Sequence, residues 1–77
     1  MATGRLRAQY DGSKVVEDLV TQGWEIRDLA RASGLHEMTI RRFIQGHPQT
    51  TKTATAIARA FGFKPRRYFL GVRTEAA

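Results

Sequence analysis

Apolar residues recur at the spacing of α-helices along most of this chain, and glycines follow the helical stretches. In residues 54–61, apolar side chains occupy positions i, i+3, i+4 and i+7, which share one face of a helix. Glycine is common just after a helix because it adopts the left-handed conformation without steric penalty. No segment alternates cleanly like a half-buried strand. The pattern therefore predicts an all-α fold, and the expected stops are Gly23, Gly34, Gly46 and Gly62.

Capping residues and stops together predict five short helices, expected over residues 13–22, 26–33, 36–45, 50–61 and 65–70. Ser13 is the expected cap of the first helix, and Pro65 suits the first turn of the last. The first helix is expected to bury an apolar stripe of Val15, Val16, Leu19 and Val20. We expect one domain over residues 13–71, between a flexible basic segment 1–12 and a flexible tail 72–77.

The charge of the chain is strongly positive and unevenly spread. Thirteen Lys and Arg oppose seven Asp and Glu in 77 residues, and the sequence pI is near 10.8. Residues 15–35 are acidic on balance, whereas residues 36–53 and 54–77 are basic. A basic face of this kind is typical of proteins that bind nucleic acid. The alternative for Arg66 and Arg67 is that they only make a short helix soluble.

Several other classes of function are not indicated. The chain has no cysteine, which excludes disulfides, thiolate zinc sites and iron–sulfur clusters. Two histidines make a poor metal site, and no catalytic triad or glycine-rich phosphate loop is recognisable. We therefore expect no enzyme activity, no metal and no cofactor. No apolar run approaches the roughly 20 residues that cross a bilayer, so we expect a cytoplasmic protein without membrane contact.

Residues 26–45 combine two short helices with a tight turn at Gly34. Ala30 is small where the two helices would approach each other, and Gly34 stands where the turn needs a positive φ. This arrangement is a helix-turn-helix, whose second helix lies in the major groove of DNA. The apolar residues that would lock the pair together are Leu29, Leu35, Ile40 and Phe43.

The runs LARASGLHEMTIRRFIQG and TATAIARAFGFKPRRYF resemble the lambda-repressor-like helix-turn-helix domains. This family includes the Cro and CI repressors of phages and the xenobiotic-response-element regulators. The resemblance covers residues 13–70 and implies a compact five-helix domain that reads bases with its third helix. The residues in register are Ala30, Gly34, Ile40, Gly46, Ile57, Ala58, Phe61, Gly62 and Pro65.

The resemblance implies that the third helix carries the base-reading residues Glu37, Met38, Thr39, Arg41 and Arg42. Arg42 can donate two hydrogen bonds to guanine, Glu37 can accept from cytosine, and Met38 can contact a thymine methyl. Thr39 can reach a base or a phosphate, and so can Arg41. The alternative for Arg41 is a salt bridge to Glu37 at i,i+4. Glu37 alternatively serves as a favourable charge at a helix N-terminus.

Phosphate contacts are expected to frame this helix. The family places Ser or Thr and then Gln at the start of the second helix, where this chain has Glu25 and Ile26. A carboxylate and an isoleucine cannot donate hydrogen bonds to phosphate, so this contact is not expected here. Arg27 or the basic N-terminal segment is expected to replace it. Arg5 and Arg7 resemble a basic arm that lies along DNA, with a disordered tail as the alternative. The other phosphate candidates are His36, Gln45, His47, Gln49, Thr50, Thr51 and Lys52; His36 can instead cap the third helix.

These observations predict a regulator that binds specific double-stranded DNA, with a Cro-like phage repressor as the favoured form. One alternative is an antitoxin of the same fold, which binds a toxin and its own operator. Another is a module that binds an acidic protein. A homodimer is expected, formed either in solution or only on DNA. Its surface would come from Tyr68, Phe69, Leu70 and Val72 unless these residues close the core.

Overall fold

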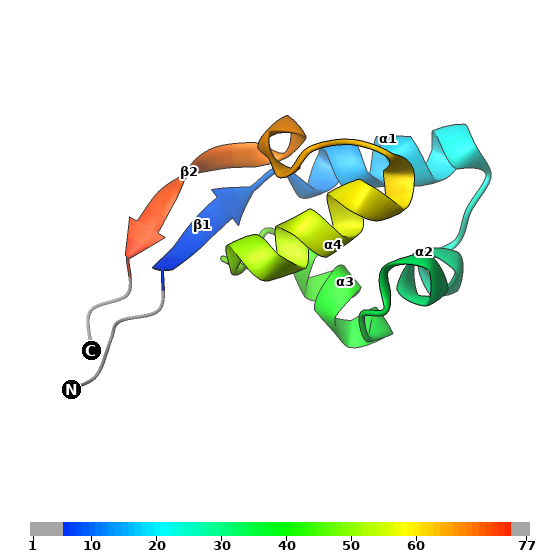
Figure 1. The fold of residues 1–77 in the computed structure, drawn as a ribbon, viewed down its shortest axis with the longest axis horizontal. Helices are drawn as coiled ribbons and strands as arrows, with labels where there is room; N and C mark the ends of the chain where they lie inside the picture. Colours follow the sequence, from blue (N-terminus) through cyan, green and yellow to red (C-terminus); the bar gives the residue numbers. More distant parts are fainter. Residues whose placement is uncertain (1–5, 75–77) are drawn as a thin grey trace.

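The computed structural model describes residues 6–74, in which helices α1 to α4 enclose one core and a two-stranded ribbon projects from one end (Figure 1). None of the helices in this range has the length and hydrophobicity needed to cross a membrane. The elements in chain order are β1 (Leu6–Tyr10), α1 (Gly12–Gln22), α2 (Ile26–Ser33), α3 (Glu37–Ile44), α4 (Thr51–Phe61), the 3-10 helix η1 (Pro65–Arg67) and β2 (Phe69–Thr74).

The two strands contradict the all-α prediction. β1 and β2 pair antiparallel, with Ala8 opposite Val72 and Tyr10 opposite Phe69, and a bulge lies between Gln9 and Tyr10. Residues 6–10 are thus a strand where flexibility was expected, and β2 occupies the end of the predicted fifth helix and the start of the predicted tail. The two strands lie at opposite ends of the sequence, so no local sequence pattern predicts that they pair.

The predicted fifth helix is also wrong, because it is a single 3-10 turn. The backbone N–H of Tyr68 donates to the carbonyl of Pro65 at 3.0 Å, and the chain then becomes extended. Aromatic and branched side chains follow directly, and such residues suit a pleated strand. The fold of the described residues is therefore four α-helices and a small sheet, not five helices.

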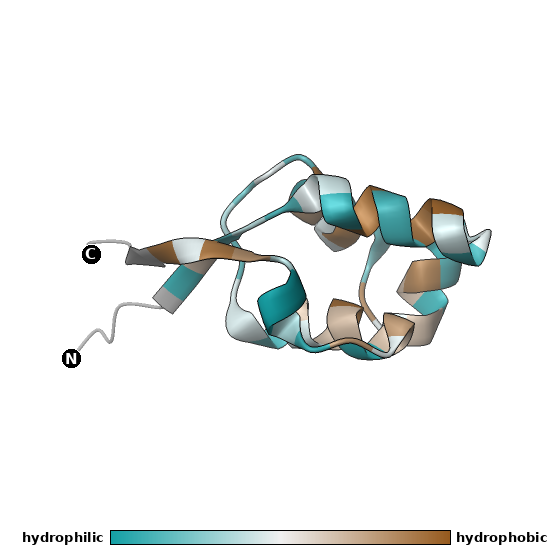
Figure 2. Cartoon of the chain, turned by 90° about the horizontal axis from the view of Figure 1, so that it is seen from above, coloured by the Kyte–Doolittle hydropathy of each residue, from teal (hydrophilic) through white to brown (hydrophobic). Residues whose placement is uncertain are grey.

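Hydrophobic and hydrophilic positions alternate along the helices, and the hydrophobic ones meet in the core (Figure 2). Helix α1 buries a different stripe from the one predicted. Val15 and Leu19 are buried, but Val20 is 74% exposed and the carboxylate-bearing Asp18 is only 5% exposed. The buried apolar residues are Ala8, Tyr10, Val15, Leu19, Leu29, Ile40, Phe43, Ala54, Ile57, Ala58, Phe61 and Tyr68.

The buried carboxylate of Asp18 is held by the C-terminal part of the chain. Arg67 donates from Nε to Oδ2 at 2.9 Å and from Nη2 to Oδ1 at 2.7 Å. The hydroxyl of Tyr68 also donates to Oδ2. Bidentate, charge-assisted bonds of this kind are among the stronger hydrogen bonds in proteins. They tie η1 to the middle of α1, so Arg67 is a structural residue and not only a solubilising one.

This network changes the acid–base properties of its members. The hydrogen bond from Arg67 holds the pKa of Asp18 below its usual value, although burial acts in the opposite direction. Burial and the nearby carboxylate raise the pKa of the Tyr68 hydroxyl. The carboxylate is therefore ionised, and the hydroxyl neutral, throughout the physiological pH range.

An aromatic cluster connects the sheet with the third helix. The ring of Tyr10 stacks on Phe43 with a centroid distance of 5.2 Å, and Tyr68 meets Phe43 edge-on at 6.2 Å. All three residues are buried. The cluster places β1 and the end of η1 against the inner face of α3.

Helix α1 begins one residue before the predicted cap. Asp11, not Ser13, is the N-cap, and its carboxylate accepts from the Ser13 backbone N–H at 3.0 Å. Gly12 then lies against the backbone of Ile44, where a Cβ atom would overlap the Ile44 carbonyl oxygen. The absence of a side chain at Gly12 thus lets the start of α1 touch the end of α3.

We predict that Asp18→Asn destabilises the domain by about 1–3 kcal/mol at pH 7, because Arg67 and Tyr68 lose their ionised acceptor. The pKa of Asp18 is lower in the folded chain than in the unfolded one, where it is about 3.9. Its stabilising effect is therefore complete above that value and disappears as the pH falls through the folded pKa.

The gap in unfolding free energy between wild type and variant should accordingly shrink below about pH 4. Urea denaturation at several pH values measures it. Glu17→Gln removes an exposed carboxylate from the same helix and is the matched control. A gap that stays constant down to the lowest accessible pH would contradict the assignment.

Candidate nucleic-acid interface

The turn between α2 and α3 has the geometry that the sequence predicted. Gly34 has a φ of +76°, and its N–H donates to the Ala30 carbonyl at 2.9 Å. Helix α3 then begins after His36, whose Nδ1 accepts from the backbone N–H of Met38 at 3.1 Å. His36 therefore caps α3 in the free protein, which was one of its two expected roles.

Helix α3 turns one face to the core and the other to the outside. Ile40 and Phe43 are buried almost completely. The opposite positions recur at the period of a helix, and Thr39 lies half-buried beside them. The exposed face consists of Glu37, Met38, Arg41 and Arg42, continued by the C-cap residue Gln45.

One ion pair crosses this exposed face. Nη2 of Arg41 lies 3.7 Å from Oε1 of Glu37, one helical turn away, as the alternative interpretation predicted. Both side chains are about half exposed, and solvent-exposed pairs of this kind contribute little to stability. The pair can therefore open when either residue meets a better partner.

A polar groove of about 570 Å³ runs beside α3. It brings the candidate base reader Arg42 next to the candidate phosphate ligands His47, Gln49 and Thr50. The other residues that line it are Arg7, Thr39, Pro48 and Thr53. Pro48 and Thr53 were not among the predicted site residues, and no sequence signal distinguished them.

Strand β1 delivers Arg7 to this groove. The backbones of Ala8 and Gln49 exchange two hydrogen bonds, of 2.9 and 3.0 Å, which fix β1 beside the loop after α3. The guanidinium of Arg7 lies 3.5 Å from the Pro48 carbonyl oxygen. Gln9 supports the same loop by donating from its side chain to the Gly46 carbonyl. Arg7 is therefore part of a strand and not of a flexible arm; Arg5 lies outside the described residues.

The start of α4 forms the far wall of the groove. Thr50 caps the helix by accepting from the backbone N–H of Thr53 at 3.4 Å. Thr51 and Lys52 are exposed in the first turn, and His47 is exposed in the preceding loop. Helix N-termini attract anions through unpaired N–H groups, and a lysine strengthens that attraction.

The start of α2 differs from the rest of the interface. Nε of Arg27 lies 3.4 Å from Oε1 of Glu25, and both side chains are at least 70% exposed. The Asp28 carboxylate accepts from the Glu25 backbone N–H at 2.8 Å and caps the helix. Arg27 is thus paired with Glu25, and it does not line the groove beside α3.

The arrangement of α2, the turn at Gly34 and α3 is that of a helix-turn-helix DNA-binding domain. A family model described as helix-turn-helix matches residues 17–69, which is more than half of the chain. The chain belongs to the lambda-repressor-like, Cro/CI-type helix-turn-helix family. This is a family of DNA-binding regulators that are in general not enzymes. No curated protein sequence and no solved structure matches the chain.

We predict that Gly34→Val destabilises the domain by about 1–3 kcal/mol through backbone strain alone. A Cβ atom at Gly34 meets nothing within 4 Å, so the strain comes from the positive φ and not from crowding. Gly34→Asn is the matched control, because asparagine tolerates this conformation better. Thermal unfolding followed by circular dichroism should rank glycine, asparagine and valine in falling order. Equal stability of the valine variant would contradict this account of the turn.

Proposed function

We propose that this protein is a Cro-like repressor that reads the major groove of its operator with α3, acting in the cytoplasm of a bacterial host. The supporting observation is that the exposed face of α3 borders a polar groove lined by Arg7, Arg42 and His47. The major groove of B-DNA is about 12 Å wide and admits one α-helix. With α3 in the major groove, the residues that line the polar groove lie close to the DNA phosphates that flank α3.

Each exposed side chain of α3 has a plausible base partner in this proposal. Arg42 donates two hydrogen bonds to guanine, and Glu37 accepts from cytosine once its pair with Arg41 opens. Met38 is 49% exposed and contacts a thymine methyl. Arg41 and Thr39 contact either a base or the backbone.

The phosphate contacts in the proposal come from both sides of α3. Arg7, His47, Gln49 and Thr50 contact one strand from the groove. Exposed residues that follow α3 or begin α4 add further contacts, namely Gln45, Thr51 and Lys52. His36, at the N-terminus of α3, and Arg27, in the first turn of α2, contribute from the other end of α3. Arg27 contributes only if DNA displaces Glu25 from it.

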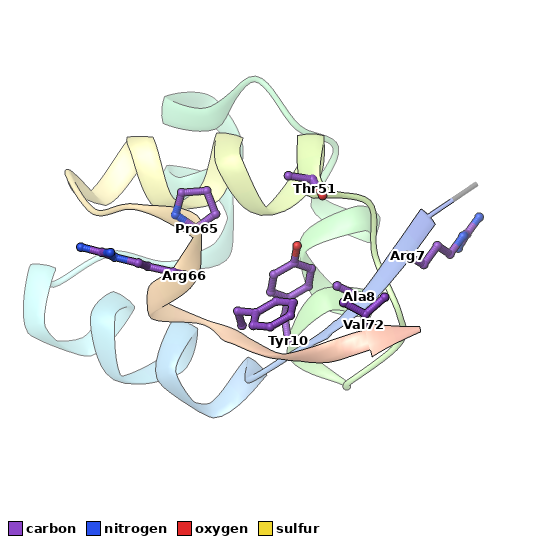
Figure 3. A pocket seen from close by; sticks show the side chains of 8 residues that line it. Arg7, Ala8, Tyr10, Thr51, Pro65, Arg66 and Val72 are labelled. Atoms are coloured by element: carbon purple, nitrogen blue, oxygen red, sulfur yellow. The ribbon is translucent and has the colours of Figure 1, made fainter. Parts of the chain in front are cut away.

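We also propose that a second copy of the chain pairs along β2. The outer edge of β2 has no strand partner among residues 6–74, and β2 carries several exposed apolar side chains. Phe69 is 46% exposed, Leu70 60% and Val72 74%. Phe69 and Val72 also border an apolar hollow of about 310 Å³ next to Tyr10 (Figure 3). Antiparallel pairing of two β2 strands satisfies this edge and produces the two-fold symmetry of a palindromic operator.

We predict that Arg42→Ala weakens binding to the preferred site by about 1–3 kcal/mol and relaxes preference at one base pair. The preferred site is first obtained by selection from random duplexes, and binding is then titrated by fluorescence anisotropy. Arg31→Ala removes an exposed arginine outside the interface and should change neither property. Equal losses on preferred and random DNA would reassign Arg42 to the phosphate backbone. Unchanged binding to both would contradict the proposed function.

We predict that Leu70→Lys/Val72→Lys leaves the protein folded but monomeric, because charges on both copies would meet across the shared edge. Sedimentation velocity with and without an operator duplex measures the oligomeric state. Val20→Lys is the control for Val72, since both valines are 74% exposed but Val20 lies on α1. Loss of the dimer in the Val20 variant, or its persistence in the β2 variant, would contradict pairing along β2.

A further inference from the structure

A second basic surface lies away from the recognition helix. It surrounds an open hollow of about 550 Å³, lined by Lys14, Gly62, Phe63, Lys64, Arg66 and Arg67. None of these residues belongs to α2, to α3 or to the groove beside α3. In the view of Figure 1, η1 and the start of α1 lie along the upper edge of the molecule and α3 lies along the lower edge.

Three cations at this hollow have no ion-pair partner within residues 6–74. Arg67 is neutralised by Asp18, but no carboxylate lies within salt-bridge distance of Lys14, Lys64 or Arg66. All three side chains are exposed, and no acidic residue lines the hollow. Like charges gathered in one depression raise the local positive potential, which favours a polyanion.

The rest of the lining indicates which polyanion fits. A protein partner needs an apolar centre, and Phe63 is the one large apolar side chain here. A single-stranded nucleic acid is held by several aromatic rings on which successive bases stack, and the lining of this hollow contains one ring, Phe63. One face of the Phe63 ring is already covered by the Arg67 guanidinium, 4.2 Å from its centroid, and Asp18 holds that guanidinium in place. Phosphates of a duplex need only exposed cations that no carboxylate contacts directly.

We propose that Lys14, Lys64 and Arg66 form a second binding surface for the phosphate backbone of duplex DNA. A protein that holds its operator through α3 thus contacts another duplex, or a distant part of the same one, with η1 and the start of α1. The proposal extends the DNA-binding function but does not depend on base reading by α3. An experiment can therefore contradict one of these two proposals without contradicting the other.

The test uses the full chain with its recognition helix disabled by Arg41→Ala/Arg42→Ala. Binding to a duplex of unrelated sequence is titrated by anisotropy at several salt concentrations. Into this background we introduce either Lys64→Ala/Arg66→Ala or the control pair Arg31→Ala/Arg59→Ala. Both pairs remove two exposed positive charges, but neither control residue lines the hollow. Melting temperatures verify that all variants fold.

The disabled protein should retain salt-dependent binding to the unrelated duplex. Lys64→Ala/Arg66→Ala should reduce the slope of log affinity against log salt by about 2, because each lost phosphate contact contributes about 0.9. The control pair should leave the slope unchanged. If both pairs have the same effect, or if the disabled protein no longer binds the duplex, the proposal is overturned.

A second experiment addresses simultaneous binding. Operator duplex is immobilised and saturated with protein that is otherwise wild type, and a fluorescent unrelated duplex is added. Wild type and the Arg31→Ala/Arg59→Ala variant should capture the second duplex, whereas Lys64→Ala/Arg66→Ala should not. Capture by all three proteins would show that the second duplex is held elsewhere, for example by α3 of a partner copy, and would overturn the proposal.

Discussion

The hydrogen-bonded ion pair between Asp18 and Arg67 connects the two ends of this fold. It holds η1 against α1, and the next residue, Tyr68, then contributes its hydroxyl to the same carboxylate and its ring to the core beside Phe43. The chain leaves Tyr68 in the direction of β1, so β2 pairs there. Strand β1 in turn holds the loop after α3 through Gln49 and brings Arg7 to the groove. The groove beside α3, which we propose faces DNA, thus depends on a contact made between η1 and α1.

A second constraint acts directly on α3, the proposed recognition helix. Gly12 touches the backbone of Ile44, so the end of α3 is fixed by the start of α1 without an intervening side chain. The other end of α3 is set by the turn at Gly34 and the cap at His36. A domain of this size has only a modest core, so close backbone contacts and satisfied buried polar groups carry much of its rigidity. Rigid placement of α3 is what a base-reading helix requires.

The basic residues fall into two groups with different surroundings. Arg41 and Arg42 lie on α3, with Arg7 in the groove beside it and Lys52 at the start of α4, whereas Lys14, Lys64 and Arg66 surround the hollow at η1. Among the acidic residues, Glu25 pairs with its neighbour Arg27, whereas Asp18 pairs with the distant Arg67. Seven of the thirteen basic residues thus belong to these two groups. Such a distribution steers the protein toward DNA over long range, with a strong dependence on ionic strength.

The sequence alone determined the features that depend on neighbours along the chain. Helices α1 to α4, the turn at Gly34 and the outward face of α3 follow from local periodicity, capping and the freedom of glycine. The strands, the short η1 and the burial of Asp18 were not predictable in this way. They depend on contacts such as Ala8 with Val72 and Asp18 with Arg67, whose partners are far apart in sequence. Arg7 is the clearest case: the family resemblance suggested a basic arm, but pairing of β1 with β2 and Gln49 made Arg7 part of a strand that lines the groove. Tertiary structure decided these points because a strand edge or a buried charge is stable only when its distant partner is in place.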